Sequence, residues 1–268
     1  RCLAEDAKTT GRWYLIVSMG RAAGHLALGI GKAAACTLTL IPEEFRGRAR
    51  RLTLDELCDI IVGSMLKRRL QERSYGMVVL AEGLLESIGE QGLQDVMMAS
   101  GVMQYGSMDR DPHGHLRLGE IEFGRMVKDR LAVKVAEVGL KGPIIDKDLG
   151  YELRCADPIP FDLEYTRDLG YGAVKFLRSD KAKEYGAVIS FSEGKMKPLP
   201  FESIINPETG RMRPRLVDVT GEGFECAKRY MIRLERSDFD EPQLTKIAEC
   251  AGMAPERFKA RFGYLVGL

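Results

Sequence analysis

Three short motifs at the ends of predicted strands carry the side chains best suited to chemistry. Met19-Gly20-Arg21 follows an apolar run from Trp13 to Val17. Glycine permits close backbone approach, arginine supplies a planar cation, and the first N–H groups of a following helix are free, so this turn suits a phosphate. Glu82-Gly83 ends another apolar run, where ligand crevices of open α/β sheets lie. Gly150-Tyr151-x-x-Arg154 brackets a short strand end and adds a further cation.

A purely structural interpretation of the first motif competes with this one. Gly-Arg after a strand occurs in many α/β proteins, and local features alone favour a solvated turn residue for Arg21. Three further glycines, at positions 24, 29 and 31, fall inside a helical pattern and predict close packing of helix on sheet. Because Gly-x-Gly-x-x-Gly does not occur there, the sequence disfavours a dinucleotide site.

Composition restricts the class of protein. Among 268 residues, 40 are basic and 39 acidic, so no global field points to nucleic acid or to a membrane. Six cysteines without Cys-x-x-Cys pairs indicate reduced thiols of a cytoplasmic protein, buried more often than reactive. No apolar run approaches membrane-spanning length. The sequence opens without Met, and we expect a preceding segment.

Strands and helices alternate along the first part of the chain. This alternation predicts a parallel sheet with covering helices. Thr53-x-x-Glu56 has the pattern of a capping box and opens one of the helices. The apolar runs place strands at 13–17, 36–41 and 77–81, and helical periodicity places helices at 21–35 and 53–70.

The later segments are more irregular. Residues 84–118 lose periodicity and predict a long insertion, in which His113 and His115 favour a loop over a metal site. The basic run 46–51 predicts a solvated loop face. Beyond them we expect helices at 119–138 and 161–177, a β run at 186–191, and a charged helical region from 223 that is broken near 237–242.

Taken in order, the three motifs resemble the phosphofructokinase family. Leu52-Thr53-Leu54 and the stretches 81–88 and 150–162 are more narrowly similar to its long, pyrophosphate-dependent branch. The resemblance covers residues 10–205. It implies an α/β fold, a parallel-sheet three-layer sandwich with part of a second lobe and a helical C-terminal tail.

The resemblance also implies a domain organisation. Residues 1–152 would form the lobe that binds fructose 6-phosphate, with the insertion at about 84–118. Residues 153–205 would form part of the lobe that binds the phosphoryl donor, and 206–268 the helical tail.

Roles in the site follow from the same resemblance. Arg21 would be catalytic, neutralising charge on the phosphoryl group in flight, whereas Glu82 would accept hydrogen bonds from sugar hydroxyls. Arg154 would hold the sugar phosphate, and Tyr151 stands where many ATP-dependent relatives have a histidine. The implied substrate-binding residues are Arg12, Met19, Gly20, Arg21, Glu82, Lys147, Tyr151 and Arg154.

Two of these residues bear on assembly and on departures from the family. Arg12 corresponds to an arginine that shorter relatives supply across a subunit interface, which implies a homodimer or homotetramer. Lys147 would provide the second such cation, because Ile145 occupies the position of the arginine expected there. Glu43 matches an effector-site carboxylate of regulated relatives, and we interpret it as structural here.

Two family motifs are absent from these 268 residues: the Gly-Gly-Asp loop for the donor and the Thr-Ile-Asp-Asn-Asp segment with the catalytic base. The sequence therefore predicts the C-terminal part of a phosphofructokinase that transfers a phosphoryl group from pyrophosphate to the C1 hydroxyl of fructose 6-phosphate. Mg²⁺ would be held mainly by residues outside this chain. The alternatives are an ATP-dependent enzyme and a non-catalytic regulatory subunit or sugar-phosphate-binding module. A generic nucleotide-binding enzyme is disfavoured.

Overall fold

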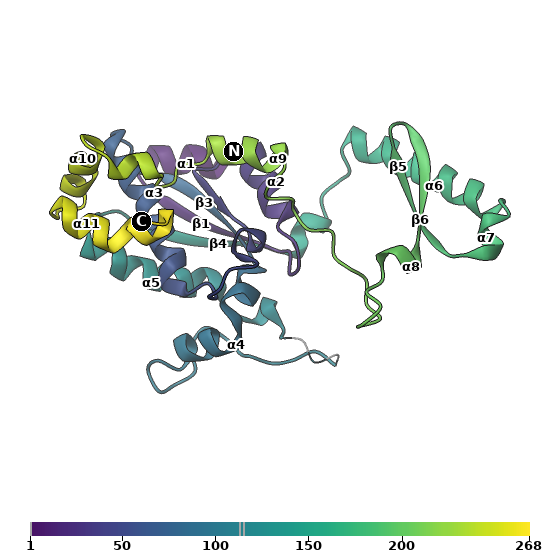
Figure 1. Ribbon diagram of the computed structural model, residues 1–268, viewed down its shortest axis with the longest axis horizontal. Helices are drawn as coiled ribbons and strands as arrows, with labels where there is room; N and C mark the ends of the chain where they lie inside the picture. Colours follow the sequence, from purple (N-terminus) through teal and green to yellow (C-terminus); the bar gives the residue numbers. More distant parts are fainter. Residues whose placement is uncertain (1, 113, 115) are drawn as a thin grey trace. The chain divides into compact units, whose positions relative to one another are not determined.

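The computed structural model describes residues 2–112, 114 and 116–268. Two compact units divide the chain: Arg1–Gly150 together with Leu216–Leu268, and Tyr151–Arg215 (Figure 1). The sequence places its boundaries at residues 152 and 205, whereas the chain leaves the first unit after Gly150 and returns to it at Leu216.

The first unit contains a sheet of four parallel strands in the order β2-β3-β1-β4. β1 (Trp13–Ser18) lies between β3 (Gly76–Ala81) and β4 (Ile144–Leu149), and β2 (Leu38–Leu40) forms the far edge. Every residue of β1 and β3 is buried, which explains why both strands are continuous apolar runs in the sequence. The three predicted strands are confirmed.

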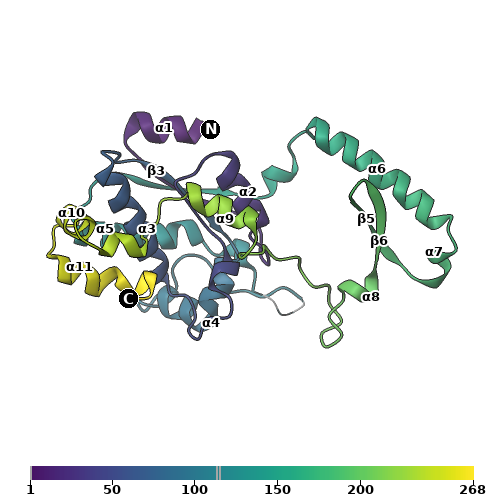
Figure 2. The same cartoon turned by 45° about the horizontal axis from the view of Figure 1, so that its top comes forward.

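Helices cover both faces of this sheet and make three layers (Figures 1 and 2). Successive side chains of a strand point to opposite faces, so β1 sends Leu15 into one core and Tyr14 into the other. The face of Leu15 is covered by α3 (Leu54–Leu70) and α5 (Phe123–Glu137). The opposite face is covered by α1 (Cys2–Thr10), α2 (His25–Ala33) and α9 (Glu222–Tyr230). The predicted three-layer α/β fold is confirmed.

Local signals in the sequence explain where two of these helices lie. Thr53 caps α3, its hydroxyl accepting a hydrogen bond from the Glu56 N–H at 3.1 Å. α2 packs closely on the sheet because of its glycines: a Cβ at Gly31 would lie 2.0 Å from Thr39 Oγ1. A Cβ at Gly29 would meet nothing within 4 Å, so the packing interpretation is wrong for that glycine.

The region 84–118 differs from the expectation of an aperiodic insertion. α4 (Leu84–Met97) occupies its first part, interrupted at Gly89, which has φ +80°. The interruption breaks the helical periodicity of the apolar residues, so the helix was not predicted from the sequence.

The C-terminal region is helical, as predicted. α10 (Gln243–Cys250) packs against α3, and α11 (Pro255–Phe262) packs against α10. The region belongs to the first unit. Short 3₁₀ helices complete this unit at Pro42–Phe45, Leu118–Glu120, Arg236–Phe239 and Gly263–Val266.

The second unit is built on an antiparallel pair of strands, β5 (Ala187–Ser192) and β6 (Lys195–Pro200). The predicted β run at 186–191 and helix at 161–177 are confirmed, and β6 is a strand for which the sequence made no prediction. Its helices are η3 (Tyr151–Arg154), α6 (Pro160–Leu177), α7 (Lys181–Glu184) and α8 (Phe201–Ile204). None of the helices in the described residues is sufficiently long and apolar to cross a lipid bilayer.

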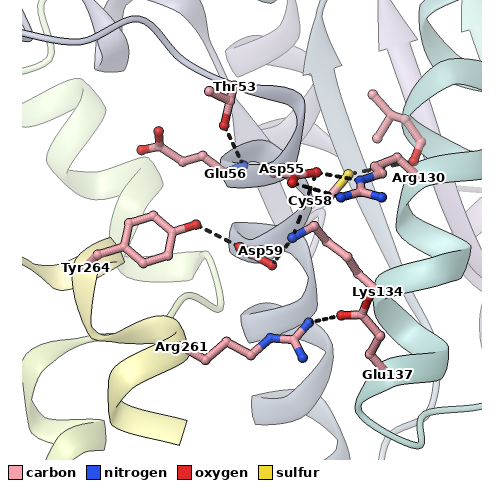
Figure 3. Close-up of polar contacts among 11 residues, drawn as sticks. Thr53, Asp55, Glu56, Cys58, Asp59, Arg130, Lys134, Glu137, Arg261 and Tyr264 are labelled. Carbon is pink, nitrogen blue, oxygen red and sulfur yellow. Dashed lines mark hydrogen bonds and ion pairs between the residues drawn. The ribbon is translucent and has the colours of Figure 1, made fainter. Parts of the chain in front are cut away.

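Polar side chains join α3 to α5 and to the C-terminal segment (Figure 3). Asp59 of α3 accepts hydrogen bonds from Lys134 Nζ at 2.8 Å and from the Tyr264 hydroxyl at 2.7 Å. One turn earlier, Asp55 pairs with Arg130, whose Nη2 donates at 2.8 Å. Both acceptors lie on α3, so these contacts fix α5 and the C-terminal segment against the same helix.

Candidate active site

The carboxyl ends of the three longer strands meet at one edge of the sheet. In register, Ser18 is paired with Ala81 on one side and with Leu149 on the other. The backbone continues this pattern beyond the strands: the Glu82 N–H donates to the Ser18 carbonyl and the Met19 N–H to the Leu149 carbonyl, both at 2.9 Å. Two of the predicted motifs therefore leave the sheet side by side.

The closest link between these two motifs joins Gly20 to Glu82. The Gly20 N–H donates to Glu82 Oε2 at 3.2 Å, and the Gly83 N–H donates to the Gly20 carbonyl at 3.2 Å. Gly20 has φ +134°, which only glycine adopts readily, and a Cβ at Gly83 would lie 2.3 Å from the Arg21 carbonyl oxygen. The two glycines therefore allow the half-buried Glu82 carboxylate to approach the turn that carries Arg21.

Arg21 is held by two acceptors. Its Nε donates to Glu86 Oε1 at 2.9 Å and its Nη2 to the Leu116 carbonyl at 2.6 Å. The side chain remains 37% exposed. Among the described residues Nη1 has no hydrogen-bond partner, so the guanidinium is positioned and still has N–H groups for an anion.

This edge thus combines the Glu82 carboxylate, a tight glycine turn at Gly20 and the positioned guanidinium of Arg21. A carboxylate can accept hydrogen bonds from the hydroxyls of a polyol, and a guanidinium can bind a phosphate. A family profile described as Phosphofructokinase matches residues 1–177 of the chain. The chain belongs to the phosphofructokinase family.

Curated relatives match over almost the whole chain. A pyrophosphate–fructose 6-phosphate 1-phosphotransferase of Thermotoga maritima is 45% identical over 267 residues, covering 99% of this chain and 61% of the relative. The protein of the same name from Naegleria fowleri is 45% identical over 272 residues, covering 99% and 60%. The chain thus spans about three-fifths of the length of these relatives. The solved phosphofructokinase structure from Saccharomyces cerevisiae has a TM-score of 0.47 at 19% identity, covering 93% of this chain and 24% of that one.

Two of the predicted family residues lie away from this edge. Arg12 precedes β1 and so lies at the opposite end of the sheet, separated from Met19 by a strand of roughly 15–20 Å. Its Nη1 is 3.8 Å from Asp6 Oδ2. Lys147 lies within β4, opposite Ile16, and is exposed. Within this unit neither cation is brought to Glu82.

The Tyr151 and Arg154 pair belongs to the second unit. The backbone of both residues lies in η3, which replaces the strand end predicted there. Their side chains, like His113 and His115 as a whole, lie outside the described part of the structure.

Metal-ligating side chains are scattered over the described residues. In residues 2–112, 114 and 116–268, no three His, Cys, Asp or Glu side chains are grouped so as to hold a metal ion.

Glu86 and the Leu116 carbonyl were missed in the sequence analysis. Glu86 had a signal, since it is an acidic residue in the first turn of α4, four positions after Glu82. The Leu116 carbonyl had none, because any residue supplies a backbone carbonyl and only the tertiary fold brings this one to Arg21.

Other charged groups near the turn have structural roles. Glu43 is buried and accepts from the Gly24 N–H at 2.9 Å and from the Val217 N–H at 3.0 Å, which confirms its structural interpretation. The basic run 46–51 is more than a solvated face: Arg48 and Arg50 both pair with buried Glu56, at 2.7 and 3.0 Å.

Proposed function

We propose that the chain forms the sugar-phosphate-binding part of a phosphofructokinase that transfers a phosphoryl group from pyrophosphate to the C1 hydroxyl of fructose 6-phosphate. Membership of the family supports this proposal, as do the names of the two relatives with 45% identity. The observation that carries it is the hydrogen bond from Gly20 to Glu82 beside the anchored Arg21, because it brings together residues 62 positions apart.

Each residue at the edge has a distinct part in this reaction. The Glu82 carboxylate accepts hydrogen bonds from sugar hydroxyls, and Met19 and Gly20 line the sugar. Arg21 stabilises negative charge on the equatorial oxygens of the transferring phosphoryl group, and this charge is greatest in the transition state. Because Glu86 and the Leu116 carbonyl already hold the guanidinium, little reorganisation accompanies the reaction.

The remaining predicted residues complete the site from elsewhere. Arg154 and Tyr151 would hold the sugar phosphate, and Lys147 and Arg12 would act across a subunit interface, in a homodimer or homotetramer. The position of Arg12 at the far end of β1 favours such a contribution to a neighbouring copy. The donor loop, the catalytic base and the Mg²⁺ ligands are not assigned to residues of this chain.

Titration of fructose 6-phosphate into the chain tests the substrate. Replacing Glu82 with Ala removes charge-assisted hydrogen bonds, and the affinity should fall by about 1.5–3 kcal/mol, roughly tenfold to a hundredfold. Arg154→Ala should lower it by about 2 kcal/mol or more. Glu249→Gln, a change at an exposed carboxylate of α10, serves as the control. Unchanged affinity in Glu82→Ala, with an intact circular dichroism spectrum, would contradict the proposal.

Turnover tests the reaction. In a polypeptide that carries this sequence and phosphorylates fructose 6-phosphate, Arg21→Ala should lower kcat more than it raises KM, because the contact strengthens in the transition state. Pyrophosphate should support turnover and ATP should not. Binding without turnover from either donor would favour a non-catalytic sugar-phosphate-binding module.

A further inference from the structure

A hollow of about 550 Å³ lies next to Arg21. Its walls come from α4, from the end of the basic run and from the segment around Leu116 and Leu118. Three guanidinium groups and two carboxylates line it: Arg21, Arg51, Arg110, Glu86 and Glu90. All belong to the first unit.

Two of the three cations are paired with the two carboxylates. Arg21 pairs with Glu86, as described above. Arg110 donates from Nη2 to both carboxylate oxygens of Glu90, at 2.7 and 2.8 Å, and from Nη1 to the Gly114 carbonyl at 2.7 Å. Both carboxylates of the hollow are therefore paired with an arginine, and the third arginine has no carboxylate partner there.

The remaining cation is Arg51. Its side chain has no hydrogen bond or ion pair with any residue in the ranges 2–112, 114 and 116–268. Its neighbours in the basic run, Arg48 and Arg50, both pair with Glu56, so Arg51 is distinguished from them by its surroundings.

The fold makes room for Arg51 at this wall. At Gly89 the helix α4 is interrupted, with φ +80°, and a Cβ there would lie 1.9 Å from Arg51 Nη1. Any other residue at this position would therefore both strain the backbone and push the guanidinium out of the wall. The glycine that interrupts α4 therefore also leaves the space that the Arg51 guanidinium occupies.

We propose that this hollow binds a phosphate-type oxyanion, with Arg51 as its main ligand and Arg21 beside it. A guanidinium presents a planar fork of N–H donors that matches two phosphate oxygens, and a charge without a counter-ion in a concave wall favours a small anion. The inference deepens the proposed function, on which it rests: the oxyanion is carried by pyrophosphate or by a sugar phosphate. Arg21 lines the hollow and directly follows Gly20, whose N–H donates to Glu82, so the two binding regions meet at this turn.

Calorimetric titrations of the chain at fixed ionic strength test this site. Pyrophosphate and fructose 6-phosphate are titrated separately into the wild type, Arg51→Gln and Arg73→Gln. Arg73 is the matched control, an exposed arginine before the amino end of β3, at the opposite edge of the sheet. In Arg51→Gln the affinity for at least one of the two anions should fall about tenfold or more, whereas Arg73→Gln should match the wild type. The anion affected identifies the source of the oxyanion.

Any of three results would overturn the proposal. The first is affinity for both anions within twofold of the wild type in Arg51→Gln, and the second is no binding of either anion by the wild type. The third is an equal loss in Arg73→Gln, which would mean that only overall charge matters. Unchanged anion affinity in Arg51→Gln would refute only the oxyanion site. The proposed function is tested separately, by the affinity of Glu82→Ala for fructose 6-phosphate.

Discussion

The ion pair between Lys134 and Asp59 allows the sharpest prediction about stability. Each side chain is 9% exposed, and Lys134 Nζ lies 2.8 Å from Asp59 Oδ1. Lys134→Met removes the ammonium group and replaces one methylene with sulfur, so it keeps an unbranched apolar side chain that is one heavy atom shorter. The Asp59 carboxylate then stays buried, with the Tyr264 hydroxyl as its remaining donor (Figure 3).

The expected loss is large because a buried charge without its partner is costly. Breaking a buried pair at one partner costs about 3–5 kcal/mol, a large part of the 5–15 kcal/mol by which proteins are typically stable. Tyr264→Phe removes one hydrogen bond to the same carboxylate and should cost less, about 1.5–3 kcal/mol. Burial and this hydrogen bond also raise the pKa of Tyr264, so its hydroxyl remains a donor at neutral pH.

Urea unfolding followed by tryptophan fluorescence measures these losses. Trp13 is the single tryptophan of the chain and is buried in β1, so the signal reports the first unit. The control is Arg229→Met, which breaks the exposed pair of Arg229 and Glu225 in the same unit and should change stability by less than about 0.5 kcal/mol.

A triple replacement separates the cost of an orphaned charge from the value of the pair. Asp59→Leu, Lys134→Met and Tyr264→Phe together remove the buried charges of this cluster, and this variant should be more stable than Lys134→Met alone. The reasoning would be refuted by a loss below about 1 kcal/mol in Lys134→Met, or by a triple variant that is less stable than the single one.

Three further outcomes are expected. Glu43→Ala leaves the buried N–H groups of Gly24 and Val217 unpaired and should cost about 2–5 kcal/mol in thermal or urea unfolding, and Glu43→Gln, which keeps an acceptor oxygen, should cost less; equal losses would count against this account. The hydrogen bond from Arg130 lowers the pKa of Asp55, so its stabilisation is present above the unfolded pKa of about 3.9 and is lost as the pH falls through the lower folded value. The stability gap between the wild type and Asp55→Asn, measured by urea unfolding, should therefore narrow below about pH 4, and a constant gap would argue against the pair. Burial raises the pKa of Cys36 to about 11 and that of Cys58 further. An aromatic disulfide reagent at pH 8 should therefore modify these two thiols only after denaturation. It should first modify the exposed thiols, which are Cys2, Cys155 and Cys226.

The exposed thiols also correct an expectation. The sequence predicted cysteines that are buried more often than reactive, but three of the six are exposed, two are buried and Cys250 is intermediate. The spacing between cysteines does not show whether each side chain faces the core or the solvent. Cys226, for example, lies in α9 and is exposed.

The elements that were predicted have local causes. β1 and β3 are buried on both faces and so consist almost entirely of apolar residues, with Ser18 at the end of β1 as the exception. α3 begins at a cap that can be recognised within four residues. β4 was predicted only as a short strand end at Tyr151–Arg154, because its polar residues, Asp146, Lys147 and Asp148, lie in an edge strand whose residues are all at least partly exposed.

The candidate site also has a part that the sequence predicted and a part that it did not. Its residue types were predictable, because a phosphate and a polyol require particular groups at strand ends, and Met19-Gly20-Arg21 and Glu82-Gly83 display them in short motifs. Their partners were not predictable: Arg21 bonds to Glu86, 65 positions away, and to the carbonyl of Leu116, 95 positions away. The sequence assigned Arg51 to a solvated run, and Arg51 is exposed, but its position beside Gly89 in the wall of the hollow depends on the tertiary fold.

The sequence by itself determined the layered α/β fold, the family and the two motifs at the carboxyl edge, since burial and phosphate binding each demand residue types that recur over a few positions. Only the tertiary structure decided which charges are paired and which are left over. Arg48, Arg50 and Arg51 are alike along the chain, and the packing of α3 and α4 gives the first two a carboxylate and the third a hollow. The reason is physical: the energy of a charge depends on what lies within a few ångströms of it, and those neighbours come from distant parts of the chain.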